Sequence, residues 1–442
     1  MAGLSPRIPL LRMVSLLAGC LLAAGCAAAY GRQQVPDGIY RSAIRGKPPY
    51  LHAMIRDLLE EGERNRVLNW NRIALRALRR GDRENAKSYF DLSIREINTI
   101  FANTERANQA RSLWFKEEVK SFKGDPYERA MVFFYRGLLY YVDGELDNAR
   151  AAFRSGQLQD AFAEESQNRS DFAVFEYLEG RVTQRIDSPA EALEILERLK
   201  RLNRGIPVPR PEENVLLVAT LNQGPIKYAF ARDPHQLRYR TAPALLKGVL
   251  LLMDGEVLGG TVRAEDLNFQ ATTRGGREFD HIMEGKVVFK RTTGELGTAA
   301  LATGAVLGRA AGGSRSRKAR EKLAVASLAA LTTGVFLKAL SGFARTEADT
   351  RTWMALPGQI YLWSGRLPPG EHRMEMRYYT VEPGNGREVF RGGAGPPERA
   401  RPWLGRIAAF ERKDLRREFS VRIEPGRNDT LIFVPSPNAL DG

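Results

Sequence analysis

Residues 126–153, PYERAMVFFYRGLLYYVDGELDNARAAF, decide how the first half of the chain folds. Apolar and aromatic residues recur every three or four positions on both sides of Gly144, as they do along amphipathic helices. Gly144 can adopt the backbone conformation of a helix end, and the small residues Gly137 and Ala149 let two antiparallel helices approach closely. The stretch therefore predicts a pair of helices joined by a tight turn.

This pattern resembles a tetratricopeptide (TPR) helix pair at Phe133, Gly137, Tyr140, Gly144, Ala149 and Phe153. An earlier stretch has the same spacing at Trp70, Ala74, Ala77, Gly81, Ala86 and Phe90, and a weaker copy runs from residue 180 to 196. The turns at Gly81 and Gly144 are 63 residues apart (144 − 81), whereas contiguous TPR units repeat every ~34. We expect TPR-like helices with an insertion at about 94–125, and a generic helical bundle is the alternative.

The second half of the chain has the character of β-structure. A proline-rich segment at 206–211 excludes a continuing helix, and the apolar run NVLLVATL at 214–221 has the length of a strand. Similar short runs follow at 247–253 and 285–290. Apolar and polar residues alternate at 373–378, which predicts a strand with one buried face.

The last strands are expected to form a terminal hairpin. Residues 419–423 alternate, and a turn at 424–429 leads into 430–434. The predicted fold class is α+β, with a TPR-like α-helical domain at 49–204 followed by a mainly antiparallel β domain at 212–435.

A segment rich in glycine and alanine, 296–343, interrupts the β domain. Small residues recur there at every fourth position, Ala300, Gly304, Gly308 and Gly312, a helix-packing stripe that allows close approach. The first apolar run of the segment is shorter than the ~20 residues that span a bilayer, and the second contains Lys338. We expect an inserted helical pair covering the sheet. Surface-bound, self-associating or membrane-spanning helices are the alternatives.

The first 26 residues have the layout of a secretory signal peptide. Arg7 and Arg12 precede an apolar run that closes with Gly25 and Cys26. A Cys at this point is typical of a lipoprotein signal, whose removal at residues 1–25 leaves a lipidated, palmitate-bearing Cys26. Cys20 is the alternative, because residues 17–19 before it fit the usual lipobox better, although it leaves a shorter apolar core. A plain cleaved signal without a lipid and an uncleaved anchor are further alternatives. Residues 26–48 are then the lipidated Cys and a tether.

Charge and cysteine content narrow the classes of partner and site. Removing Arg7 and Arg12 from the formal charge of +15 leaves +13, which favours anionic partners such as lipid headgroups or a cell-wall polymer. The secretory start argues against nucleic acid. Cys20 and Cys26 are the only cysteines, so the mature chain has no thiol left for a disulfide, a metal or a nucleophile once Cys26 is lipidated. We expect no cofactor and no metal.

The densest polar cluster is a junction motif, TEADTRTWMALP at 346–357. It contains Glu347, Asp349, Arg351 and Trp353. A catalytic interpretation pairs Asp349 with Arg351 in an envelope hydrolase, and the favoured interpretation is a structural junction in which the pair satisfies backbone groups. No phosphate loop, metalloprotease motif or serine elbow is present. No catalytic constellation emerges, and the chain is expected not to be an enzyme.

Several short motifs together resemble a family of largely uncharacterised bacterial lipoproteins of the outer membrane, with TPR-like N-terminal helices and a β-rich C-terminal part. They are the Cys motif at 26, PYERA at 126–130, NQGP at 222–225, EADTRTW at 347–353, LP at 356–357 and LPPG at 367–370. The resemblance implies attachment to the outer membrane, facing the periplasm, without an assigned catalytic activity. Ala27 lacks the acidic character that commonly retains lipoproteins in the inner membrane.

These features predict a protein-interaction or scaffold module of the cell envelope, with unknown envelope proteins as partners. Tyr127, Arg129, Phe134 and Tyr141 are the candidate interaction residues, because aromatic and Arg side chains are typical binding anchors. We expect at least half of these four to belong to the core instead. A membrane-associated oligomer built on the glycine stripe is a further alternative.

Overall fold

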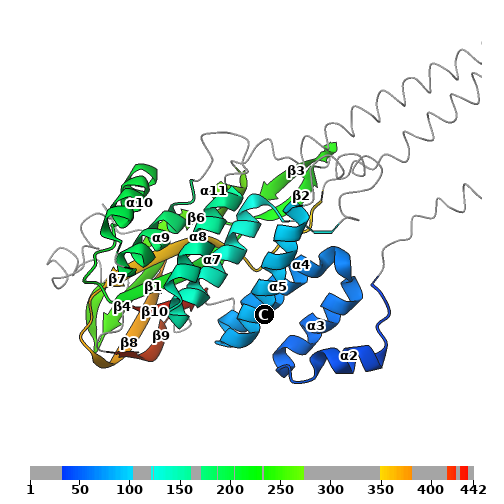
Figure 1. Ribbon diagram of the computed structural model, residues 1–442, viewed down its shortest axis with the longest axis horizontal. Coiled ribbons are helices and arrows are strands. Elements are labelled where there is room, and N and C mark those ends of the chain that lie inside the picture. Colours follow the sequence, from blue (N-terminus) through cyan, green and yellow to red (C-terminus); the bar gives the residue numbers. More distant parts are fainter. Residues whose placement is uncertain are drawn as a thin grey trace, which may run out of the picture.

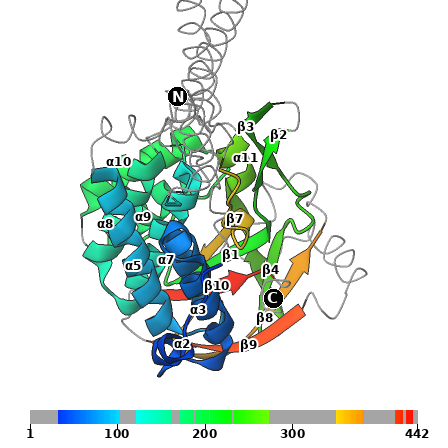
Figure 2. The same cartoon turned by 90° about the vertical axis from the view of Figure 1, so that its right-hand side faces the viewer.

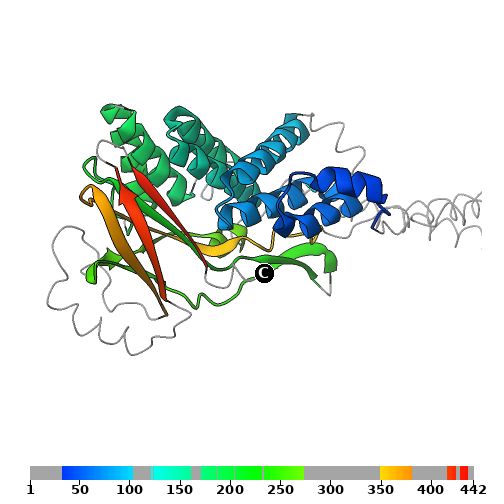
Figure 3. The same ribbon diagram turned by 90° about the horizontal axis from the view of Figure 1, so that it is seen from below.

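Helices, a first β-sheet and a second β-sheet lie on one another as three layers in this computed structural model (Figure 1). The structure describes residues 32–102, 121–122, 124–160, 171–186, 188–203, 205–230, 233–272, 349–380, 416–424 and 429–436. Seen from below, the helices run along one side and the strands along the other (Figure 3). The expected combination of helices and antiparallel sheets is therefore confirmed.

The helical layer is built from consecutive helices that pack against their neighbours along the chain. Its elements are α2 (Asp37–Ile44), α3 (Pro49–Glu61), the 3-10 turn η1 (Glu63–Asn65), α4 (Arg66–Arg79), α5 (Arg83–Ala102), α7 (Pro126–Asp143), α8 (Leu146–Asp160), α9 (Ala173–Arg185) and α10 (Pro189–Leu202). Helix α2 lies within the predicted tether 26–48, so the tether is not irregular throughout. Asp37 stands in the first turn of this helix, where a negative charge is favourable.

Local chemistry explains where α7 begins and ends. Asp125 and Glu128 form a reciprocal capping box around Pro126 at the first helical position. At the other end Gly144 adopts the left-handed conformation with φ of 79°. A Cβ added to Gly137 would lie 2.4 Å from the ring of Phe153, so only glycine allows α7 and α8 to pack this closely.

Within the described ranges, the strands form two four-stranded sheets and a separate hairpin. The inner sheet has the order β10-β1-β7-β6, the outer sheet has the order β5-β4-β8-β9, and β2 pairs with β3. The bounds are β1 (Val215–Gln223), β2 (Ile226–Phe230), β3 (Asp233–Arg240), β4 (Gly248–Met253), β5 (Glu256–Gly260), β6 (Val262–Asp266), β7 (Pro357–Gly365), β8 (Gly370–Tyr379), β9 (Arg416–Ile423) and β10 (Thr430–Pro435), with the short helix α11 (Leu267–Thr272) after β6. All pairings between these strands are antiparallel except that of β1 with β10.

The inner sheet is covered on both faces (Figure 2). In β1, Leu216 and Val218 belong to the core shared with the helices. Val215 and Leu217 belong to the core shared with the outer sheet. A strand buried on both faces reads as a continuous apolar run, which explains why this stretch shows no alternation.

Most of the predicted strands are found, and one predicted pairing is wrong. The runs at 214–221 and 247–253 correspond to β1 and β4, and the alternating 373–378 lies in β8, with Met374, Met376 and Tyr378 buried. The terminal hairpin does not form: β9 pairs with β8 in the outer sheet, whereas β10 pairs with β1 in the inner sheet. The predicted strand at 285–290 and the helical pair at 296–343 lie outside the described residues.

Candidate functional site

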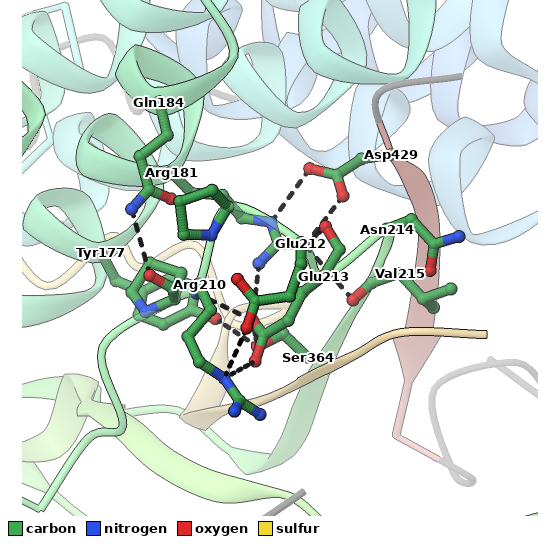
Figure 4. Close-up of polar contacts among 12 residues, drawn as sticks. Tyr177, Arg181, Gln184, Arg210, Glu212, Glu213, Asn214, Val215, Ser364 and Asp429 are labelled. Carbon is green, nitrogen blue, oxygen red and sulfur yellow. Dashed lines mark hydrogen bonds and ion pairs between the residues drawn. The ribbon is translucent and has the colours of Figure 1, made fainter. Parts of the chain in front are cut away.

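A buried ionic cluster joins α9 to the inner sheet (Figure 4). Arg181 of α9 is fully buried, and its Nη2 and Nε donate hydrogen bonds to the two carboxylate oxygens of Asp429 at 2.8 and 3.0 Å. Its Nη1 lies 3.2 Å from Oε2 of Glu213, at the start of the inner sheet. A guanidinium removed from water needs charged partners in this fork geometry, so the three side chains form one electrostatic unit.

Two further side chains complete the environment of Asp429. Arg185, one turn after Arg181, donates from Nε to Asp429 Oδ2 at 3.2 Å, and Tyr141 of α7 donates its hydroxyl hydrogen to the same oxygen. Burial and the Asp429 carboxylate raise the pKa of Tyr141, although Arg181 opposes them, so the phenol keeps its proton and acts as a donor. The cluster thus connects α7, α9 and the residue that precedes β10.

A chain of hydrogen bonds extends from this cluster into a cavity. The hydroxyl of Tyr177 donates to Ser364 Oγ at 3.0 Å, and Ser364 donates to Glu213 Oε2 at 2.6 Å. These side chains line a pocket of about 320 Å³ between α9, the proline-rich segment at 206–210 and strand β7. Its apolar wall includes Ile206 and Leu362. A small cavity with apolar walls and a few convergent polar groups has the composition of a ligand site.

A second buried cluster surrounds Lys227, at the start of the β2–β3 hairpin. Its Nζ lies 3.3 Å from Asp125 Oδ2 and contacts the Glu128 carboxylate. Glu128 Oε1 also accepts a hydrogen bond from the backbone nitrogen of Trp353 at 2.9 Å. Burial lowers the pKa of Lys227, but Asp125 and Glu128 together raise it above its ordinary value, so the ammonium stays charged.

The Lys227 cluster brings together three motifs that lie far apart in the sequence. PYERA at 126–130 supplies Glu128, and the EADTRTW motif supplies Trp353. NQGP at 222–225 lies just before Lys227, and its Gly224 donates its backbone hydrogen to Leu356 O at 3.0 Å. A Cβ on Gly224 would lie 2.7 Å from that oxygen, which explains the glycine. These motifs therefore meet where the helices pack on the strands.

The four candidate interaction residues are all buried, which corrects the expectation that some of them form an exposed binding surface. Tyr127 packs edge-on against Tyr239 of β3, and Phe134 packs against Phe175 of α9. Arg129 donates from Nε to Gln159 Oε1 at 2.7 Å and from Nη1 to Gly124 O at 2.8 Å. Tyr141 contacts Asp429, as described above. Their partners belong to the same chain.

The residues of the junction motif have structural contacts. Arg351 donates from Nε and Nη2 to the Asp349 carboxylate at 2.8 and 2.7 Å, and from Nη1 to Arg64 O at 2.9 Å and Asn65 Oδ1 at 2.8 Å. Arg351 thus ties this segment to the turn before α4. Trp353 is fully buried beside Tyr135, with ring centroids 6.0 Å apart. These contacts agree with the favoured interpretation of Asp349 and Arg351 as a junction.

Six of the predicted residues lie outside the part of the chain that the structure describes: Cys20, Cys26, Gly304, Gly308, Gly312 and Glu347. Sequence patterns do not predict the charged residues of the two buried clusters, because their partners are distant in sequence. These residues are Arg181, Lys227, Glu213 and Asp429. The sequence around Arg181, LEGRVTQR at 178–185, is mainly polar and carries no signal of its burial, which follows from the packing of a helix buried from Ala173 to Thr183.

Within the described ranges, no helix has both the length and the apolar character needed to cross a bilayer, and no group of three His, Cys, Asp or Glu side chains is arranged to hold a metal ion. Comparisons of the chain with protein families, with curated proteins and with solved structures found no match.

Proposed function

We propose that the chain is a lipoprotein anchored through Cys26 in the outer membrane, where it faces the periplasm and serves as a protein-interaction scaffold of the cell envelope. The signal-like start, the cysteine that ends it and the series of motifs support this proposal. The glycine-alanine segment 296–343 is proposed as an inserted helical pair within the β domain.

We further propose that α4–α5, α7–α8 and α9–α10 are TPR-like pairs. The first helix of each pair carries a small residue at the point of closest approach, namely Ala74, Gly137 or Gly180. A Cβ on Gly137 would meet Phe153 at 2.4 Å, and one on Gly180 would meet Leu196 at 2.5 Å. The same interlock in two successive pairs supports a repeat rather than an irregular bundle.

The observation that carries the proposal is the burial of the first helices. Every residue from Pro126 to Leu139 in α7, and from Ala173 to Thr183 in α9, is buried, because the inner sheet covers one side of these helices and the neighbouring helices cover the others. The chain's own β domain therefore occupies the face that a helical repeat offers to a partner. Among the described residues of α7 to α10, the outward faces of the second helices stay open to a partner, and there Leu158 of α8 is 59% exposed and Leu193 of α10 is 60% exposed.

The test is crosslinking and pull-down from membranes of the native host, comparing wild type with Leu158→Glu/Leu193→Glu. Apolar residues near the centre of an interface carry much of its binding energy, so we expect the double variant to lose most of its crosslinked partners. Leu245→Glu is the matched control, because Leu245 is 70% exposed but lies in the loop before β4. Equal recovery of partners by the double variant and wild type would reject these helix faces as the interaction surface.

The lipid anchor is tested separately with Cys26→Ala. We expect this variant to leave the membrane fraction, and mass spectrometry of the wild-type N-terminus should find the acylated residue at Cys26. A variant that stays in the membrane with all its partners would show that the lipid does not position the protein.

A further inference from the structure

We propose that the pocket beneath the proline-rich segment binds a small neutral ligand that donates a hydrogen bond, such as an alcohol, a phenol or an amide. This inference concerns the pocket alone and does not depend on the lipid anchor or on the outward helix faces. It rests on three properties of the pocket: its shape, the direction of its hydrogen bonds and its charge balance.

The shape is that of a site with a buried floor and an accessible rim. Tyr177, Ile206 and Leu362 are almost fully buried. Pro207 and Val208 also line the pocket, and of these Pro207 is exposed and Val208 is half-exposed. With a volume of about 320 Å³, the cavity is at the small end of the range of ligand sites, ~300–1,000 Å³, and it suits a single ring or a short chain.

The direction of the hydrogen bonds defines what the floor offers. The Glu213 carboxylate can only accept, so Ser364 must donate its one hydrogen to Glu213 Oε2. Ser364 therefore accepts from Tyr177, whose one hydrogen is then used. Burial raises the pKa of Tyr177, which keeps it a neutral phenol. Tyr177 lines the pocket, and its oxygen keeps a lone pair that can accept a hydrogen bond, so the complementary ligand group is a hydroxyl or an N–H.

The charges around the floor are balanced within the protein. The Glu213 carboxylate lies 3.2 Å from Arg181 Nη1 and 3.2 Å from Arg210 Nε. Arg181 and Arg185 both face Asp429 from the other side. Arg210 also lies 3.7 Å from Glu212 Oε1, so three carboxylates balance three guanidiniums. A charged ligand would have to enter a site with no excess charge of the opposite sign, at a considerable desolvation cost. A neutral ligand avoids this cost.

The experiment titrates the full chain with two probes of similar size, phenol and acetophenone, and follows methyl NMR signals of Ile206, Val208 and Leu362. Phenol donates a hydrogen bond, whereas acetophenone only accepts. We expect saturable shifts of these methyl groups with phenol and about tenfold weaker binding of acetophenone, because its carbonyl would face the Tyr177 lone pair.

Ser364→Ala is the decisive variant, because it frees the Tyr177 hydrogen to point into the pocket. The disadvantage of acetophenone should then disappear, an outcome that a purely hydrophobic cavity would not produce. Val208→Trp at the rim should block both probes while the rest of the methyl spectrum is retained. The proposal is overturned if phenol shifts none of these methyl signals in a saturable way, or if Ser364→Ala leaves the preference unchanged.

Discussion

Replacing Asp429 by Asn tests how much the buried charges stabilise the contact between helices and sheet. The substitution keeps the size of the side chain and removes the negative charge that faces Arg181 and Arg185. Breaking a buried ion pair costs about 3–5 kcal/mol, because the remaining charge stays out of water. Arg181 is fully buried but retains Glu213 at 3.2 Å, so we expect a loss near the lower limit, about 3 kcal/mol.

Urea unfolding followed by tryptophan fluorescence measures this loss, since Trp353 and Trp363 are both buried. The double variant Asp429→Asn/Arg181→Met should lose less than the sum of the two single variants, because removing both charges relieves the desolvation penalty. Glu418→Gln is the matched control. It breaks the exposed ion pair between Arg373 and Glu418 in the outer sheet and should leave the unfolding midpoint almost unchanged.

Two results would refute this reasoning. A loss below about 1 kcal/mol for Asp429→Asn would mean that Arg181 is hydrated or repositioned, as at a surface pair. Additive losses in the double variant would mean that Asp429 acts through packing and not through its charge. Either result would remove the electrostatic explanation of the contact between α9 and β10.

Three other variants test separate parts of the structure. Gly137→Ala should lower the free energy of unfolding by about 1–3 kcal/mol, because its Cβ would lie 2.4 Å from the Phe153 ring; adding Phe153→Leu should recover part of the loss in urea unfolding, and no recovery would contradict the interlock. Burial raises the pKa of Tyr378 to about 12, so its contribution to stability is full below pH ~10 and is lost as the pH rises toward 12. Tyr378→Phe should flatten this fall in thermal melts between pH ~9 and ~12, and equal slopes for the two proteins would exclude Tyr378 as the cause. Lys227→Met should cost about 3–5 kcal/mol because Glu128 stays buried without its cation, and Glu128→Gln should restore part of the stability, whereas a further loss would speak against the ion pair.

The sequence predicts the elements better than their partners. The helices and strands follow from periodicity, which depends only on neighbouring residues. The Lys227–Glu128 and Arg181–Asp429 contacts join residues 99 and 248 positions apart, and no local pattern encodes them. For the same reason, the sequence makes the aromatic residues of α7 candidates for an exposed surface as well as for the core. Their burial depends on a sheet that is built from the second half of the chain.

The error in the terminal hairpin has a recognisable physical cause. β9 alternates between exposed and partly buried residues, as expected for a strand with one covered face. Residues 431–434 of β10 are instead a continuous apolar run, in which Ile432 and Val434 face the outer sheet while Leu431 and Phe433 face the helices. Two strands with such different patterns belong in different environments. This difference was present in the sequence and could have separated them.

The two ionic clusters lie at opposite ends of α7 and together fix how the helices sit on the sheet. Glu128 contacts Lys227 near the start of this helix, and Tyr141 contacts Asp429 near its end. Thirteen residues of α-helix separate the two points by about 20 Å. Apolar side chains alone would tolerate small shifts of one layer over the other, whereas a shift that separated Glu128 from Lys227 would leave buried charges unpaired. We infer that the apolar contacts supply most of the attraction between the layers and that the two clusters select one position of the helices on the sheet. In this position the first helices stay covered, and the outward faces of α8 and α10 keep a constant relation to each other.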